Sequence, residues 1–232
     1  MAQERYRHTR YSSEWDFGFS TLHAVLDPGE VDLAPLSSTL RGLLMRILLA
    51  SSSPRRRELL STLVPEFETV SPEIDETPAQ GEKPRAYVAR LAASKAGHCA
   101  ASGALSLGAD TTVCVGRRIL GKPADAEDAR RMLSLLSGRT HEVHTAVALA
   151  SVEYAQIAVV STAVTFTELS DEAIERFLMT DEPWDKAGGY GIQGYAGSFV
   201  ARIEGSYSAV VGLPLCETRA LLVAAGVTPR HG

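Results

Sequence analysis

The feature that most constrains this chain is a repeated change of hydrophobic period, from strand-like to helical and back, that begins at residue 46. Short apolar runs predict strands, and apolar residues at every third or fourth position predict helices. This alternation is typical of an α/β fold. Strands are expected at 46–50, 105–109, 112–115, 140–150, 156–167, 198–203 and 207–211. Helices are expected after Ser53, over 84–101 and 124–136, after Ser170, and from Pro214 to Gly226.

Two neighbouring Val-rich runs, 140–150 and 156–167, indicate a hairpin. Because hairpin strands are antiparallel, we expect a mixed sheet flanked by helices.

The apolar stretch 145–164 is long enough to be considered as a membrane span, but Glu153 lies at its middle. A bilayer tolerates charge least at its centre, so two strands with a turn are the preferred interpretation.

The first 44 residues do not follow this alternation. Pro28 and Pro35 interrupt any long element, and Met45 stands directly before the first convincing strand. We therefore predict an N-terminal extension over 1–44, either poorly ordered or an artefact of the start site. The remainder, 45–232, is expected to form one large domain, as its length allows.

Charge and composition limit the partners. The chain carries 23 Lys and Arg against 28 Asp and Glu, a net charge of −5. Proteins that coat nucleic acid or an anionic membrane are usually basic, so neither is expected as the main partner. Residues 1–10 are polar and are followed by no apolar core of a secretory signal. We therefore expect a cytoplasmic protein.

Cysteine and histidine spacing argues against a structural zinc site or a disulfide framework. The three cysteines, at 99, 114 and 216, form no CxxC pair, and their number is odd. Reduced thiols fit a cytosolic protein. His141 and His144 are three residues apart in a predicted strand and so point to opposite faces. A zinc site built on both is therefore disfavoured.

Hydroxyl and guanidinium groups follow the first strand at the start of a helix. Ser53 is suited to cap that helix and Pro54 to begin it. The free N–H groups of such a helix end, with Ser51, Arg55 and Arg56, would suit a phosphate. The plainer explanation is a capped helix with solvated arginines. The motif lacks the glycines and the final Gly-Lys-Ser/Thr of a Walker loop.

Acidic and basic residues from separate segments suggest a magnesium-assisted phosphate site. Asp110 lies beside hydroxyls at the junction of two predicted strands, and Glu76 lies in a loop. Carboxylates in such places can bind Mg²⁺ or activate water. Lys95, on a predicted helix, and Lys122, before a proline, could meet phosphate charges. Each of these residues alone is more often an ordinary solvated side chain.

A glycine-rich segment, 184–194, is interpreted as a functional loop. Its four glycines would let the backbone approach a ligand closely. Gln193 offers an amide donor and acceptor that suit the edge of a base such as a pyrimidine. A mobile glycine loop is the plainer explanation. The dinucleotide fingerprint GxGxxG and the hydrolase elbow GxSxG are both absent.

Several separate motifs, in order along residues 46–226, resemble the Maf family of nucleoside triphosphate pyrophosphatases. Their number and order make the resemblance specific, although any one alone would be weak. The motifs are Leu49-Ala50-Ser51-Ser52-Ser53-Pro54-Arg55-Arg56, Ile74-Asp75-Glu76, Gly108-Ala109-Asp110-Thr111, Gly121-Lys122-Pro123, Leu136-Ser137-Gly138-Arg139-Thr140-His141-Glu142-Val143, Asp185-Lys186-Ala187-Gly188 through Gln193-Gly194, and Val211-Gly212-Leu213-Pro214-Leu215.

The resemblance implies an elongated Maf/ITPase-like α/β fold, with a mixed sheet and two lobes around a central cleft. It implies hydrolysis of nucleoside triphosphates between the α and β phosphates, giving a nucleoside monophosphate and pyrophosphate. The segments Asp185-Lys186-Ala187-Gly188 and Ile192-Gln193-Gly194 look like the branch that acts on dTTP and UTP. The resemblance also implies a divalent cation, Mg²⁺ or Mn²⁺, and a homodimer.

The roles of single residues follow from the same resemblance, motif by motif. Asp110 would accept the proton of the attacking water, and Glu76 would help Asp110 to hold the metal. Arg55, Thr111 and Gln193 match positions that select the substrate. Phosphate contacts would come from Ser51, Arg56, Lys95 and Lys122.

Two other functions are compatible with the sequence. A nucleotide-binding regulator of septum formation would use the same serine and arginine cradle without significant turnover. A pyrophosphatase for a modified nucleotide would differ only in its base preference. An activity assay separates the first alternative, and a substrate panel separates the second.

Overall fold

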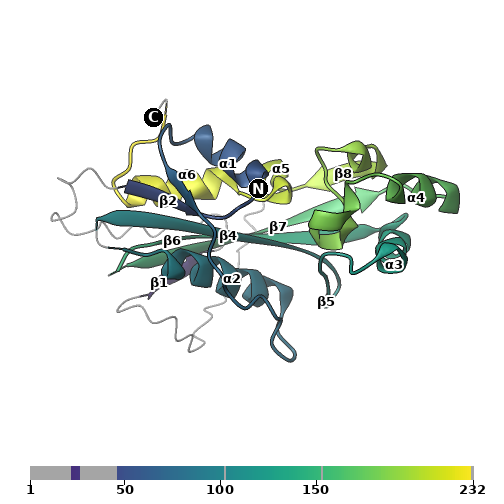
Figure 1. The fold of residues 1–232 in the computed structure, drawn as a ribbon, viewed down its shortest axis with the longest axis horizontal. Coiled ribbons are helices and arrows are strands. Elements are labelled where there is room, and N and C mark those ends of the chain that lie inside the picture. Colours follow the sequence, from purple (N-terminus) through teal and green to yellow (C-terminus); the bar gives the residue numbers. More distant parts are fainter. Residues whose placement is uncertain (1–21, 27–45, 102, 153, 231–232) are drawn as a thin grey trace, which may run out of the picture.

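A computed structural model describes residues 22–26, 46–101, 103–152 and 154–230 (Figure 1). Its centre is one eight-stranded mixed sheet in the order β1-β7-β6-β4-β2-β3, with β5 paired to β4 and β8 to β7. The strands are β1 (Leu22–Leu26), β2 (Arg46–Ala50), β3 (Glu68–Val70), β4 (Ala104–Val115), β5 (Arg118–Leu120), β6 (Thr140–Ala150), β7 (Ala155–Phe166) and β8 (Val200–Glu204).

The predicted hairpin and the mixed character of the sheet are confirmed. β6 and β7 are antiparallel, with Thr140 opposite Thr165 and Ala150 opposite Ala155. β2 runs parallel to both β3 and β4, whereas β4 and β6 are antiparallel. Among the described residues, no helix has the length and apolar character needed to cross a membrane.

Helices cover both faces of the elongated sheet. In Figure 1, α1, α5 and α6 lie over one face and α2 over the other, while α3, α4 and β8 lie at the far end. The helices are α1 (Pro54–Ser61), α2 (Pro84–His98), α3 (Ala126–Leu136), α4 (Asp171–Leu178), α5 (Tyr207–Val211) and α6 (Leu215–Ala224). Short 3₁₀ turns follow α4: η2 (Pro183–Asp185), η3 (Ala187–Gly189) and η4 (Tyr195–Phe199).

Buried apolar side chains form three clusters where the helices pack against the sheet. One lies between the sheet and the helices α1 and α6 and includes Leu60, Leu107 and Leu221. An alanine-rich cluster lies under α2, where small side chains let the helix approach the strands. A third cluster at the far end gathers α3, α4 and the segment after η3 around Phe166 and Phe177.

Two predictions of local structure were wrong. The runs 105–109 and 112–115 form one continuous strand, β4, because Asp110 and Thr111 keep the pairing with β6 unbroken. Residues 207–211, predicted as a strand, form α5. The Ser206 hydroxyl caps this helix by accepting a hydrogen bond from the Ala209 N–H at 3.2 Å. A cap is a local signal for a helix that outweighs the strand preference of valine.

The predicted extension, 1–44, is described only in part. Residues 22–26 form β1, which pairs in parallel with β7. The other residues of the extension lie outside the described part of the chain. The boundary between extension and domain therefore stays a prediction.

The edge of β4 that faces β2 has an interruption that positions the functional site. β2 ends with Ala50 opposite Gly108, and β5 begins its pairing opposite Val113. Among the described strands, none pairs with this edge over 109–112. Side chains from both faces of β4 can therefore reach one space beyond the end of β2, which is where open α/β sheets usually bind ligands.

Gly108 sets the distance between β4 and α2. A Cβ atom at this position would lie 2.4 Å from the Ala92 carbonyl oxygen and 2.5 Å from the Ala96 backbone nitrogen. Both atoms belong to helix backbone, so neither can move aside cheaply. Glycine is therefore required for α2 to lie this close to the sheet.

We expect Gly108→Ala to lower the free energy of unfolding by about 1–3 kcal/mol or more, the usual cost of overpacking a core. Urea unfolding followed by circular dichroism measures the change. Gly121→Ala is the matched control, because a Cβ atom there meets no heavy atom within 4 Å. Equal stability of the two variants would contradict this explanation of the close approach.

Candidate active site

A cleft of about 800 Å³ opens at the interrupted edge of β4. It is bounded by the end of β2, the start of α1, the loop after β3, and the segment from η2 to η4. The structure brings all nine predicted site residues to its wall. They are Ser51, Arg55, Arg56, Glu76, Lys95, Asp110, Thr111, Lys122 and Gln193.

A buried ammonium group joins two carboxylates on the α2 side of the cleft. The Nζ atom of Lys95 donates to Asp110 Oδ1 at 2.7 Å and lies 2.8 Å from Glu76 Oε1. Lys95 is 8% exposed and Asp110 is 7% exposed, so water screens this contact poorly. The contact ties together α2, β4 and the loop that precedes α2.

The two acids respond differently to this environment. Burial raises the pKa of Asp110, while the charges of Lys95 and Arg56 oppose that rise. Burial also acts to raise the pKa of Glu76, but the hydrogen bond from Lys95 and the neighbouring cations lower it overall. Ionisation of Asp110 thus depends on the positive groups around it, whereas Glu76 stays a carboxylate.

Arg56 is held in place from three directions. Its Nε donates to the Gly212 carbonyl oxygen at 2.9 Å, its Nη1 to Ser51 Oγ at 3.4 Å, and its Nη2 to Thr111 Oγ1 at 3.3 Å. Burial lowers the pKa of this guanidinium, with the charge of Asp110 opposing the change. A guanidinium remains protonated under such conditions. Arg56 therefore presents a fixed positive charge next to Asp110.

The start of α1 has the local structure predicted for it. Ser53 Oγ accepts from the Arg56 N–H at 3.5 Å, and Pro54 begins the helix. The neighbouring Arg55 reaches across the cleft to Asp185, with 3.4 Å between Nη1 and Oδ2. Asp185 in turn pairs with Lys186. The pair of Arg55 and Asp185 therefore connects opposite walls of the cleft.

Glu182 organises the segment that carries Gln193. Its carboxylate accepts hydrogen bonds from the Tyr195 N–H at 2.7 Å and the Ala196 N–H at 3.2 Å. A Cβ atom on Gly194 would lie 2.4 Å from the same carboxylate, so a side chain there would force Glu182 to shift from this position. Gln193, one residue earlier, is exposed to the cleft. Glu182 thus holds the backbone just after Gln193 and so helps to position that residue.

Sequence reasoning missed several residues of the wall, among them Tyr87, Glu182 and Tyr190. The Tyr87 hydroxyl donates to the Glu76 carbonyl oxygen at 2.9 Å, which fixes the acidic loop against α2. The Tyr190 hydroxyl oxygen lies 2.7 Å from His141 Nε2. A tyrosine on a helix and an acid before Pro183 are ordinary in sequence, so no local signal distinguishes them.

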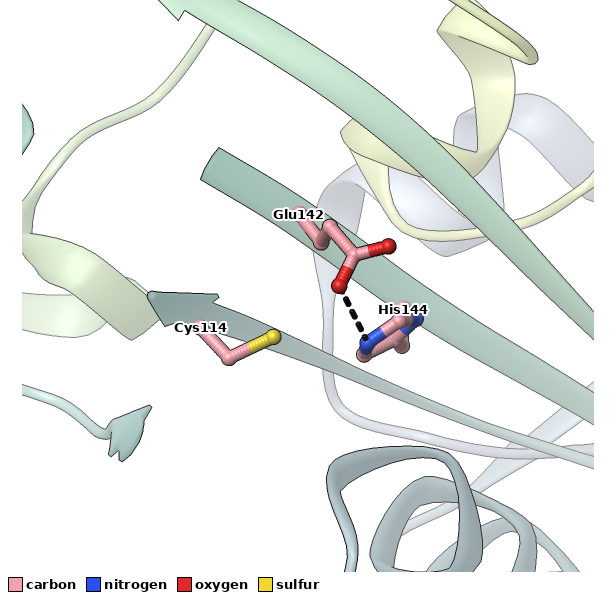
Figure 2. A group of neighbouring side chains, drawn as sticks. All are labelled: Cys114, Glu142 and His144. Carbon is pink, nitrogen blue, oxygen red and sulfur yellow. Dashed lines mark ion pairs between the residues drawn. The ribbon is translucent and has the colours of Figure 1, made fainter. Parts of the chain in front are cut away.

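The two histidines lie on opposite faces of β6, as predicted. His141 contacts Tyr190 and Phe166 in the far-end core, and burial lowers its pKa to about 4. His144 instead lies 2.8 Å from Ser161 Oγ through its Nδ1 atom. A second group of possible metal ligands, Cys114, Glu142 and His144, lies around this histidine. It is drawn in Figure 2, and none of its members lines the cleft.

Comparisons with known proteins point to the same family over most of the chain. The family model described as "Maf-like protein" matches residues 46–225. The dTTP/UTP pyrophosphatase of Shewanella sp. strain MR-7 is 52% identical over 193 residues, covering 79% of this chain and 100% of the relative. The dTTP/UTP pyrophosphatase of Myxococcus xanthus is 54% identical over 184 residues, covering 78% and 93%. That of Hahella chejuensis is 50% identical over 187 residues, also covering 78% and 93%.

We expect Glu182→Ala to loosen the Gln193 segment, because two backbone N–H groups lose their acceptor. Hydrogen exchange of the Tyr195 and Ala196 amides should accelerate by about tenfold or more, which corresponds to about 1.4 kcal/mol of lost protection. Asp181→Ala, at an exposed neighbouring acid, is the control and should leave both rates unchanged. Unchanged exchange in the Glu182 variant would contradict the organising role.

Proposed function

The chain belongs to the Maf family, and from this premise we propose that it hydrolyses dTTP and UTP between the α and β phosphates. The products would be a nucleoside monophosphate and pyrophosphate. The relatives named dTTP/UTP pyrophosphatase support the reaction and the choice of base, since each is at least 50% identical over most of its length.

The observation that carries this proposal is the convergence of separately predicted residues on one cleft. Four cations and two carboxylates from five segments lie around a space of about 800 Å³, a volume in the range of small-molecule sites. A triphosphate carries several negative charges, and such a cluster of cations would offset them. A purely structural role offers no reason for these charges to gather there.

Phosphate contacts are assigned to Ser51, Arg56, Lys95 and Lys122. The support is geometric, because Arg56 and Lys95 are both fixed by hydrogen bonds that point them into the cleft. A guanidinium can grip phosphate through two parallel hydrogen bonds. Lys122 is exposed at the wall of the cleft and supplies a further point charge.

Asp110 is assigned as the proton acceptor for the attacking water. The base must be ionised in order to accept a proton, and Lys95 and Arg56 favour that form against the effect of burial. The proton of water would pass to the carboxylate as the oxygen attacks. The bond between the α and β phosphates would break, and its electron pair would stay with pyrophosphate.

A divalent cation fits the acidic side of the cleft. Glu76 and Asp110 both approach the Lys95 ammonium, so their oxygens lie within reach of one small cation. Carboxylate oxygens are the ligands that Mg²⁺ and Mn²⁺ accept. A bound Mg²⁺ would neutralise part of the phosphate charge, and Glu76 and Asp110 would hold it.

Substrate selection is assigned to Arg55, Thr111 and Gln193. Gln193 stands exposed at the wall of the cleft, where its amide can donate to and accept from a pyrimidine edge. Arg55 is free to exchange Asp185 for a substrate group, because that ion pair is exposed and therefore weak. The homodimer, the cytoplasmic location and the 45–232 domain belong to the same proposal. The homodimer rests on the family resemblance, and the other two rest on the sequence pattern.

We expect Asp110→Asn to lower turnover of dTTP by about 10²–10⁴-fold, the usual contribution of general base catalysis, while the fold is retained. Pyrophosphate release in the presence of Mg²⁺ measures turnover, and circular dichroism checks the fold. Asp171→Asn, at the exposed start of α4, is the control and should stay near wild type. Turnover of Asp110→Asn within a few-fold of wild type would remove Asp110 from the base role.

We expect Gln193→Ala to reduce the preference for dTTP over GTP by about 1–3 kcal/mol, because one or two base-edge hydrogen bonds are lost. The ratio of kcat/KM values for the two nucleotides measures that preference. Gln80→Ala changes an exposed glutamine outside the cleft and should leave the ratio as in wild type. If both variants keep the wild-type ratio, Gln193 does not select the base.

A further inference from the structure

Three chemically different side chains meet on neighbouring strands beyond the cleft. Cys114 on β4 stands directly opposite Glu142 on β6, and His144 follows Glu142 by two residues. Residues two apart on a strand share a face, so all three side chains lie on the same side of the sheet. Figure 2 shows them pointing toward one another across the two strands.

The distances and the burial resemble those of a cation site. The Sγ atom of Cys114, one Glu142 oxygen and one His144 nitrogen all lie within 4.8 Å of one another. His144 Nε2 lies 3.8 Å from Glu142 Oε2. Donors bound to one zinc ion at about 2.0–2.3 Å would lie about 3.3–3.7 Å apart, so small rotations of the side chains suffice. Cys114 and His144 are buried, and the Glu142 side chain is 53% exposed.

A second layer of hydrogen bonds orients the imidazole. His144 Nδ1 lies 2.8 Å from Ser161 Oγ, which also accepts a hydrogen bond from Arg85 Nη1 at 2.7 Å. With a proton on Nδ1, the imidazole donates to Ser161 and keeps the lone pair on Nε2. That lone pair faces Glu142 and Cys114. This is the usual arrangement of a histidine that binds a metal.

We propose that Cys114, Glu142 and His144 form a binding site for a divalent cation of borderline softness, of which Zn²⁺ is the best fit. A thiolate, an imidazole and one carboxylate are the donors that zinc accepts, whereas Mg²⁺ prefers oxygen alone. Three protein ligands would leave one coordination position of the ion to water. Binding replaces the thiol proton of Cys114, which passes to solvent.

The ionisation of the group agrees with this proposal. Burial lowers the pKa of His144, despite the opposing charge of Glu142, so its imidazole is neutral and able to coordinate. Burial and the charge of Glu142 raise the pKa of Cys114 to about 12, so the thiol is protonated until a cation displaces the proton. Without metal, the same thiol is a poor nucleophile.

The proposed site is separate from the cleft in position and in chemistry. Val113 and Val143, the neighbours of Cys114 and Glu142 on their strands, line the cleft, but the three ligands do not. Asp110 and Cys114 share one face of β4 and lie four residues apart, or about 13 Å at the rise of a strand. An ion at this site would therefore join β6 to β4, the strand that also carries Asp110.

The test uses Co²⁺ as a spectroscopic substitute for Zn²⁺. Reduced, metal-free full-length protein is first given excess Mg²⁺ to satisfy the oxygen ligands of the cleft, and Co²⁺ is then titrated. We expect one equivalent to bind with a thiolate-to-cobalt charge-transfer band in the near ultraviolet, and Zn²⁺ to abolish the band. Absence of such a band would overturn the proposal.

Variants assign the band to particular residues. Cys114→Ser should remove it. Glu142→Gln should weaken Co²⁺ binding by about tenfold or more, because mutation of groups that merely support metal ligands already costs about 10–100-fold in affinity. Cys99→Ser and Cys216→Ser are matched controls and should keep both band and affinity. Glu142 is exposed, so its variant tests the site even if Cys114→Ser fails to fold. A band lost in either control, or wild-type affinity in Glu142→Gln, would contradict the assignment.

Discussion

The ammonium group of Lys95 holds Asp110 and Glu76 together where α2, β4 and the loop after β3 meet. In a poorly screened interior, removing such a cation would leave a buried carboxylate uncompensated, at a cost of about 3–5 kcal/mol. The position of Lys95 in turn depends on the close approach of α2 to β4, which requires glycine at position 108. Packing and charge therefore support one another at the point where the proposed chemistry occurs.

The interrupted edge of β4 explains why so many elements contribute to one cleft. Because β2 ends opposite Gly108, Asp110 on one face of β4 and Thr111 on the other both border the same space. Arg56 fills one side of that space and is tied to Thr111 and to Gly212. A continuous sheet would have separated these groups on its two faces.

Sequence reasoning succeeded where the signal was local. Ser53 and Pro54 begin α1 because a cap and a proline act within one helical turn, and the hairpin of β6 and β7 follows from composition. The nine predicted residues that line the cleft were named through motifs. The continuity of β4 was missed because it depends on pairing with β6, a distant segment. Glu182 and the Cys114 group were missed for the same reason, since their partners lie on other elements.

The products of dTTP test the proposed reaction most directly. Phosphorus NMR of dTTP with wild-type protein and Mg²⁺ follows each phosphate group as it is converted. We expect dTMP and pyrophosphate to appear together in equal amounts, with no dTDP. Formation of dTDP and inorganic phosphate would contradict cleavage between the α and β phosphates. Persistence of dTTP at stoichiometric protein would contradict catalysis altogether.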